Sequence, residues 1–260
     1  MGLLKRLVFP PTCAGCGEKF DIFSKDFDPD KVFCRKCRSE WERAKLSRCG
    51  KCGSLNIDCM CAPHLLRDMN VVSLVKFGEV YAVDSLIYRL KRRNINRLFD
   101  FTANEMSKHL ITFVKERFID LSNAVIVNVP RKRRSTIDYG FDHAKILAEL
   151  VAKNIGIDYC EALVRVRGGR DQKKLGAAQR LENSKNKFDV ASDESEHVRG
   201  KLVILVDDVV TSGATCAACI EIIKESDPMG IIILSIAKND YSGEKNKNRD
   251  RNKKVNKEKE

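Results

Sequence analysis

Closely spaced cysteine pairs dominate the first quarter of the chain. The sequence has 11 cysteines, and eight of them form four pairs: Cys13 and Cys16, Cys34 and Cys37, Cys49 and Cys52, Cys59 and Cys61. Three pairs have the C-x-x-C spacing, in which a tight turn places two thiolates on one side of a cation. Two such turns complete a tetrahedron of sulfur ligands. The pattern therefore predicts that these eight cysteines bind structural zinc, as one or two ions.

The spacing leaves the grouping of these cysteines open. Sequential grouping puts the first four on one ion and the last four on another, but interleaved grouping also fits. His64 is close enough in sequence to replace a ligand of the last pair. Buried cysteines without metal are the alternative, which the repeated spacing disfavours. Because four thiolates leave no open coordination position, we expect the metal to stabilise the segment rather than to catalyse.

Composition and charge limit the classes of protein to which the chain can belong. With 260 residues and 43% hydrophobic residues, the chain can bury a sizeable core. No apolar run approaches the ~20 residues of a membrane helix, and residues 1–11 lack a signal-peptide pattern. We therefore expect no membrane span and a cytoplasmic location. The net charge of +12 favours anionic partners such as nucleic acids or phosphorylated metabolites.

Strand-like and helix-like segments alternate after Pro63. Strands are predicted at 71–77, 124–129, 163–166, 201–206 and 231–237. Helices are predicted at 81–90, 98–118, 141–155 and 214–224, with a further short helix within 168–187. This alternation is typical of a parallel α/β sheet. We divide the chain into a cysteine module at 1–65, an α/β domain at 66–240 and a disordered basic tail at 241–260.

The segment 203–215 carries the most specific chemical pattern. An apolar strand runs into Asp207 and Asp208, and a hydroxyl-rich turn then opens a helix. The turn consists of Thr211, Ser212, Gly213, Ala214 and Thr215. Its backbone N–H groups and the helix N-terminus suit a phosphate, and two adjacent carboxylates suit the diol of a sugar. The pattern predicts a ribose 5-phosphate site at the carboxyl end of a parallel strand. Simple capping of the helix by these side chains is the alternative.

This segment resembles the signature of type I phosphoribosyltransferases, which bind phosphoribosyl pyrophosphate (PRPP). The resemblance implies that Asp207 and Asp208 face the ribose hydroxyls and that the turn 211–215 holds the 5-phosphate. It also implies Mg²⁺ as a cofactor bound together with PRPP. If the protein is an enzyme, Asp207 and Asp208 would stabilise a cation-like ribose during phosphoribosyl transfer. The sequence leaves open whether turnover occurs.

Cysteine turns ahead of such a domain further resemble the ComF family of competence-related proteins. That family combines a double zinc ribbon with a parallel-sheet, type I phosphoribosyltransferase fold. Further positions that match it are Lys91, Val129, Pro130, Gly140, Phe141, Gln172, Leu175, Arg180, Asn183 and Phe188. The chain departs from the family at Tyr139, Asp142 and His143, where the family has Arg, Asn and Gln. Arg131 and Lys132 lie in the loop expected to cradle the pyrophosphate.

The ComF resemblance implies a PRPP-binding protein that contacts single-stranded DNA during DNA uptake and natural transformation. Its expected partners are DNA-uptake or helicase proteins. A salvage phosphoribosyltransferase acting on a free base and a non-catalytic PRPP sensor are the alternatives. Basic clusters at 89–93, 131–134 and 173–174 could bind the phosphates of a single strand. With one Trp and 7% aromatic residues, no base-stacking surface is evident from the sequence.

Overall fold

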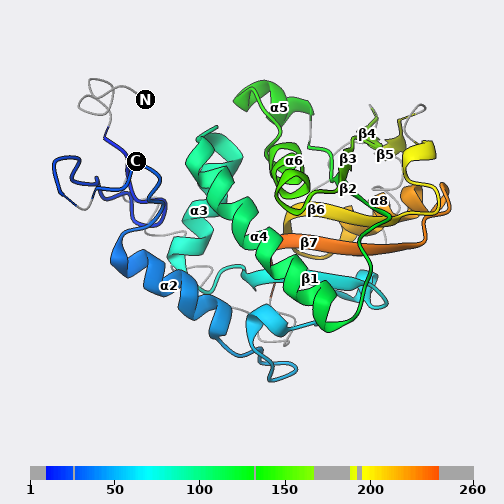
Figure 1. Cartoon of the computed structure of the whole chain (residues 1–260), viewed down its shortest axis with the longest axis horizontal. Helices are drawn as coiled ribbons and strands as arrows, with labels where there is room; N and C mark the ends of the chain where they lie inside the picture. The colour runs from blue at the N-terminus through cyan, green and yellow to red at the C-terminus, as the bar shows by residue number, and fades with distance from the viewer. Residues whose placement is uncertain (1–9, 26, 132, 167–187, 192–194, 240–260) are drawn as a thin grey trace, which may run out of the picture.

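A five-stranded parallel sheet forms the centre of the molecule. This computed structural model describes residues 10–239 except 26, 132, 167–187 and 192–194. The strand order is β1-β7-β6-β2-β3, and every neighbouring pair in the sheet is parallel (Figure 1). These strands are β1 (Asn70–Lys76), β2 (Ala124–Asn128), β3 (Asp158–Cys160), β6 (Leu202–Val210) and β7 (Gly230–Lys238). All carboxyl ends therefore lie at one edge of the sheet, where open parallel sheets bind ligands.

Alternating apolar residues explain why both faces of the sheet are covered. Along β6, Ile204 and Val206 belong to one core cluster, whereas Val203 and Leu205 belong to a second cluster on the opposite face. Successive strand residues point to opposite faces, so a continuous apolar run buries both. Burying both apolar faces of β6 therefore requires helices on each face of the sheet.

Helices cover both faces of the sheet. They are α2 (Arg35–Leu46), α3 (Tyr81–Arg92), α4 (Asn96–Glu116), α5 (Arg133–Tyr139), α6 (His143–Ile155) and α8 (Ala214–Lys224). Buried side chains of α2, α3, α4 and α6 form the first core cluster, and those of α8 join the second. Short 3₁₀ turns occur at η1 (Asn56–Asp58), η2 (His64–Leu66) and η3 (Ser195–His197). No helix in the described part of the chain is long and apolar enough to cross a bilayer.

The cysteine-rich segment packs directly on the α/β domain. Trp41 of α2 is fully buried, and its indole N–H donates to Glu105 of α4 at 3.0 Å. Lys45 adds an ion pair to the same carboxylate at 2.8 Å. The rings of Phe33 and Trp41 also contact Phe101 at 5.5 and 5.6 Å between ring centroids. This segment therefore shares the core of the larger domain.

Most of the predicted elements are present, and their ends differ for local reasons. Helix α6 begins at His143 rather than 141, because the Asp142 carboxylate accepts the N–H groups of Ala144 and Lys145 and so caps it. Strand β6 extends four residues further than predicted, through both aspartates to Val210. The predicted strand at 163–166 corresponds to β4 (Leu163–Arg165), which pairs antiparallel with β5 (Phe188–Val190) outside the main sheet.

Some predictions concern residues outside the described part. These are Lys132, the basic pair at 173–174, the short helix within 168–187, the disordered tail at 241–260, and the matches at Gln172, Leu175, Arg180 and Asn183. Helices α2 and α5 and strands β3 and β5 were not predicted. Strands β3 and β5 have only three residues each, too few to show a periodic pattern.

Candidate functional site

A cavity of about 450 Å³ opens at the carboxyl edge of the sheet. Its walls include Asp207, Asp208, Thr211 and Thr215, which the sequence placed in one phosphate and ribose site. The remaining lining residues come from other elements: Phe77, Lys91, Val129, Pro130, Arg131, His143, Ala144, Arg165 and Val209. The cavity thus combines two carboxylates, two hydroxyls and three basic side chains.

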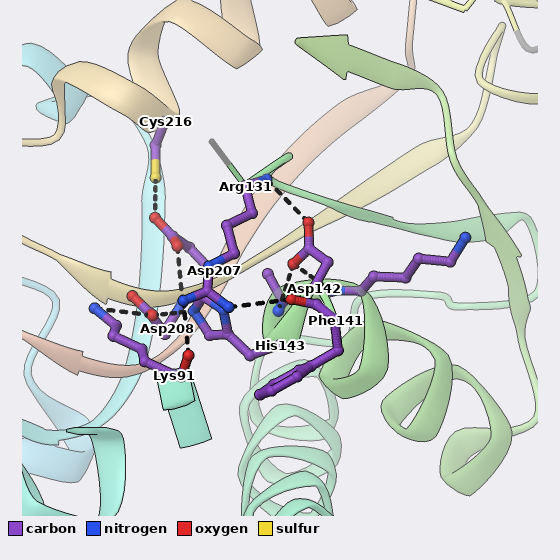
Figure 2. A network of polar contacts seen from close by, with 10 residues as sticks. Lys91, Arg131, Phe141, Asp142, His143, Asp207, Asp208 and Cys216 are labelled. Carbon is purple, nitrogen blue, oxygen red and sulfur yellow. Dashed lines mark hydrogen bonds and ion pairs between the residues drawn. The ribbon is translucent and has the colours of Figure 1, made fainter. Parts of the chain in front are cut away.

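The two adjacent aspartates have different surroundings. Asp208 is buried, and its Oδ2 contacts both His143 Nε2 and Lys91 Nζ, the latter at 3.0 Å (Figure 2). Burial alone would raise the pKa of Asp208, but the hydrogen bond from His143 and the charge of Lys91 lower it to about 2. Asp208 is therefore ionised, and its carboxylate faces the ammonium of Lys91 and the ring of His143.

Asp207 is the carboxylate for which the cost of burial is not offset by cationic or hydrogen-bonding partners. Burial and the neighbouring charge of Asp208 raise the pKa of Asp207 to about 6. Its Oδ1 accepts the backbone N–H of Asp208 at 2.8 Å, and the thiol of Cys216 donates to its Oδ2 at 3.6 Å (Figure 2). Different environments thus separate the protonation of two neighbouring acids, an arrangement that is enriched at functional sites.

The turn after β6 places a helix N-terminus at the cavity. Gly213 has φ +76° and forms the N-cap of α8, a left-handed conformation that glycine adopts at low cost. The peptide dipoles of the 11-residue helix α8 add up along its axis, and its first N–H groups therefore present a partial positive charge. Thr211 and Thr215 line the cavity, whereas Ser212 is exposed and Gly213 and Ala214 are buried within the same turn. The local geometry fits the predicted anion site.

Arg131 is held in place at the cavity wall. Its guanidinium donates to the carbonyl oxygens of Lys91 and Phe141 at 2.7 and 3.1 Å, and its backbone N–H donates to Asp142 at 3.0 Å (Figure 2). Asp142 therefore caps α6 and also fixes the loop that carries Arg131. The departures at Asp142 and His143 are thus integrated into the site, since His143 in turn contacts Asp208.

Arg165 is a charged lining residue that the sequence analysis did not single out. It is the last residue of the short strand β4, and its guanidinium lies 4.9 Å from the ring centroid of Phe188. Its place at the cavity depends on tertiary packing, including the antiparallel pairing of β4 with β5, which no local motif encodes.

The eight cysteine thiols of the first 61 residues form two groups in sequence order. Within each group, the sulfur atoms lie within 4.8 Å of one another. The groups are Cys13, Cys16, Cys34 and Cys37, and Cys49, Cys52, Cys59 and Cys61. His64 belongs to neither group and is exposed. The structure therefore groups the cysteines sequentially, with four thiols in each set.

The sulfur geometry fits tetrahedral zinc. Sulfur–sulfur distances are 3.8 Å for Cys16–Cys34, 4.0 Å for Cys49–Cys61 and 3.7 Å for Cys52–Cys59. A zinc–sulfur bond of about 2.3 Å and a tetrahedral angle require a separation of about 3.8 Å. Both sets could hold zinc, and neither has an open position for a substrate.

Comparison with known proteins assigns the second half of the chain. A sequence model described as "Phosphoribosyl transferase domain" matches residues 142–259, somewhat less than half of the chain. These residues are therefore similar to a phosphoribosyltransferase domain. The matched part contains both aspartates and the turn 211–215, whereas Lys91 and Arg131 precede it.

Individual relatives match over shorter parts of the chain. An adenine phosphoribosyltransferase from Helicobacter pylori is 29% identical over 115 residues, 44% of this chain and 57% of that protein. A 2',3'-cyclic-nucleotide 3'-phosphodiesterase from Kluyveromyces lactis is 30% identical over 90 residues, 35% of this chain and 40% of that protein. The chain thus spans about half the length of these relatives.

Solved structures show a looser likeness. A hypoxanthine phosphoribosyltransferase from Staphylococcus aureus has a TM-score of 0.35 and 12% identity, covering 54% of this chain and 64% of that one. The assignment to a phosphoribosyltransferase fold is therefore based on the domain match and on the parallel sheet with its carboxyl-edge site.

Proposed function

We propose that the protein binds PRPP in the cavity at the carboxyl edge of the sheet. The observation that carries this proposal is the convergence of both aspartates, the α8 turn and three basic side chains on one cavity. The turn is suited to the 5-phosphate, and the aspartates to the ribose hydroxyls. Lys91, Arg131 and Arg165 supply the positive charge that suits the negatively charged pyrophosphate.

The chain's own residues have distinct roles in this proposal. Asp208 is oriented by His143 and Lys91, so its carboxylate is fixed before PRPP arrives. Both carboxylates would stabilise positive charge developing on the ribose if the pyrophosphate departs. When bound, Mg²⁺ neutralises pyrophosphate charge. It would be held mainly by PRPP oxygens, because Asp208 is already paired with His143 and Lys91.

Titration calorimetry of the zinc-loaded protein with PRPP and Mg²⁺ tests the proposal. We expect saturable binding that Asp208→Asn weakens at least tenfold, since hydrogen bonds to a charged acceptor contribute about 1.5–3 kcal/mol. Asp158→Asn is the matched control, because Asp158 is an exposed carboxylate on β3. Absence of binding by the unaltered protein, or equal binding by Asp208→Asn, would refute the ribose assignment.

We further propose a ComF-like role in DNA uptake and natural transformation, with single-stranded DNA and DNA-uptake or helicase proteins as partners. The resemblance of the cysteine module and the basic composition support it. Because all eight ligand cysteines are free thiols suited to zinc, a reducing compartment is favoured, and we propose the cytoplasm.

An alternation of arginine and tyrosine beside the cavity supports contact with bases. The guanidinium of Arg92 lies 4.1 Å from the ring centroid of Tyr88 and 5.8 Å from that of Tyr139, and Arg131 lies 4.9 Å from Tyr139. Tyr88 is exposed. Guanidinium and aromatic planes of this kind are surfaces on which bases stack, which the aromatic content of the sequence did not reveal.

Fluorescence anisotropy with labelled oligothymidylate tests this contact. Tyr88→Ala should weaken binding about 5- to 150-fold, because stacking contributes about 1–3 kcal/mol per base, while PRPP binding stays unchanged. Tyr81→Ala, another exposed tyrosine of α3, is the control. Equal DNA affinity in Tyr88→Ala and Tyr81→Ala would remove the stacking surface from the proposal.

The similarity to adenine phosphoribosyltransferase favours a second candidate, salvage of a free nucleobase. The two functions are distinguished by incubating the protein with PRPP, Mg²⁺ and adenine and measuring released pyrophosphate. Base-dependent release would establish salvage activity. PRPP binding without release, together with DNA binding, would favour the ComF-like role.

A further inference from the structure

The segment that follows the second cysteine set covers the phosphate turn. Leu66, at the end of η2, is fully buried and belongs to the same core cluster as α8. A β-carbon added at Gly213 would lie 2.7 Å from Pro63 Cγ and 2.8 Å from Leu66 Cδ1. Pro63 follows the ligand Cys61 by only two residues. The turn that caps α8 is therefore in direct contact with the end of the second cysteine set.

A buried lysine forms a second link between the same two regions. Lys238 is the last residue of β7 and only 1% exposed, and its ammonium donates to the carbonyl oxygen of Cys59. The same ammonium lies close enough to the thiols of Cys59, Cys61 and Cys49 to interact with each of them electrostatically. Four thiolates on one Zn²⁺ carry a net charge of −2, so a buried cation beside them offsets part of that charge.

The backbone of β7 continues this link to the cavity. The Lys238 carbonyl accepts the N–H of Phe77, which lines the cavity, at 2.8 Å. The next residue, Asn239, donates its N–H to the carbonyl of Val210 at 3.0 Å, and Val210 immediately precedes the turn. Pro63 and Leu66, which follow the second cysteine set, thus pack against the glycine of the turn, and Lys238 connects Cys59 of that set to the strand end that begins it.

The first cysteine set has a different environment. The Ala14 carbonyl accepts the hydroxyl of Ser85 of α3 at 2.8 Å, and the Thr12 carbonyl accepts Arg97 of α4 at 2.7 Å. Its described contacts are therefore with helices rather than with the turn 211–215. The two sets are similar in sequence, but only the second is linked to the turn 211–215 by the contacts described above.

We propose that zinc bound to the second cysteine set braces the turn 211–215, so that zinc occupancy there and PRPP binding favour one another. The inference rests on the proposed PRPP site for its ligand, but the bracing itself concerns only residues of this chain. Because linkage is reciprocal, PRPP must tighten the second zinc as much as that zinc tightens PRPP. Lys238 and Leu66 are positioning residues in this scheme, since neither lines the cavity.

Hydrogen exchange without PRPP tests the bracing alone. Amide exchange at 209–215 is measured by mass spectrometry in Lys238→Met and Leu66→Ala, both of which keep all eight cysteines and every cavity residue. We expect faster exchange in this segment in both variants. Lys145→Met, which removes an exposed ion pair, and Leu110→Ala, which removes an equally buried leucine of α4, are the matched controls.

Unchanged exchange at 209–215 in both test variants would overturn the inference. So would an equal rise in Leu110→Ala, because general loss of stability would then explain the effect. Neither result depends on PRPP, so failure of the proposed function and failure of this inference are distinguishable. Zinc-dependent protection of the turn in a protein that does not bind PRPP would refute only the function.

Equilibrium competition with a zinc chelator tests the reciprocity. In the unaltered protein, saturating PRPP with Mg²⁺ should tighten one of two bound zinc ions about 5- to 150-fold, the usual range of coupling between sites. Lys238→Met and Leu66→Ala should bind PRPP more weakly and lose most of this difference, whereas Lys145→Met should retain it. Equal zinc affinity with and without PRPP in a protein that binds PRPP would overturn the coupling.

Discussion

Replacing Asp207 with Asn should make the protein more stable at neutral pH. Burial and the charge of Asp208 raise the pKa of Asp207 from 3.8 to about 6. A carboxyl whose folded pKa is raised contributes stability below its unfolded pKa and loses it as pH rises through the folded pKa. At pH 7.5 the ionised carboxylate therefore destabilises the fold. An isosteric amide removes this cost and can still accept the N–H of Asp208.

Asp207→Asn should raise the free energy of unfolding by about 1–3 kcal/mol at pH 7.5. The upper value corresponds to the full pKa shift, and the lower value allows for the partial exposure of Asp207 to the cavity. The gain should fall by about half at pH 5, since the folded protein then carries a largely protonated Asp207. Urea unfolding between pH 5 and 8 measures it. This range keeps zinc thiolates intact, because lower pH protonates cysteine ligands.

Asp208→Asn is the matched comparison, with the opposite sign. His143 and Lys91 lower the pKa of Asp208 to about 2, so this carboxylate contributes stability above pH 3.8 and loses it only as pH falls through 2. Its loss should cost about 2 kcal/mol, unchanged between pH 5 and 8. The reasoning is refuted if Asp207→Asn is less stable than the unaltered protein at pH 7.5, or if its effect does not vary with pH.

Three further predictions concern the glycines and the metal. Gly213→Ala should destabilise the protein by more than about 2 kcal/mol in urea unfolding, because its φ is +76° and its β-carbon would overlap Leu66. Gly200→Ala is the control: its φ is +65° but its β-carbon would meet open space, so it should cost only about 1 kcal/mol. Gly15→Ala should lower zinc content from two ions to one per chain by elemental analysis, because its β-carbon would lie 2.6 Å from Cys37 Sγ; retention of both ions would contradict this crowding. A chelator under denaturing conditions should release two zinc ions and prevent refolding until zinc is restored, and refolding without metal would show that the thiol sets are dispensable.

Much of the fold was predictable because its signals are local. Apolar runs at β2, β6 and β7 and the periodic spacing of α3, α4 and α8 reflect which faces must be buried, and the structure places these elements within a few residues of the predicted bounds. The strand, the two acids and the turn of 207–215 were recognisable for the same reason, since they are contiguous, and their role as a ribose 5-phosphate site stays a prediction. The cysteine spacing likewise indicated metal ligands.

Spacing could not decide the grouping of the cysteines, because sequential and interleaved sets require the same turns. Only the folded chain brings the thiols of each set within 4.8 Å of one another. The same limit applies to His143, which sequence comparison marks as a departure but which contacts Asp208 in the structure. Local sequence does not determine which distant side chain will contact a buried charge.

The sequence by itself determined most of the longer strands and helices and the spacing of the cysteine pairs, since each depends on neighbours in the chain, and it predicted an anion site in the turn 211–215. The tertiary structure alone decided that Lys91, Arg131 and Arg165 meet the aspartates in one cavity, and that Lys238 and Leu66 join the second cysteine set to the phosphate turn. These contacts span up to 179 residues of sequence. They form only when the sheet closes and its helices pack, because burial of both sheet faces sets the distances between elements.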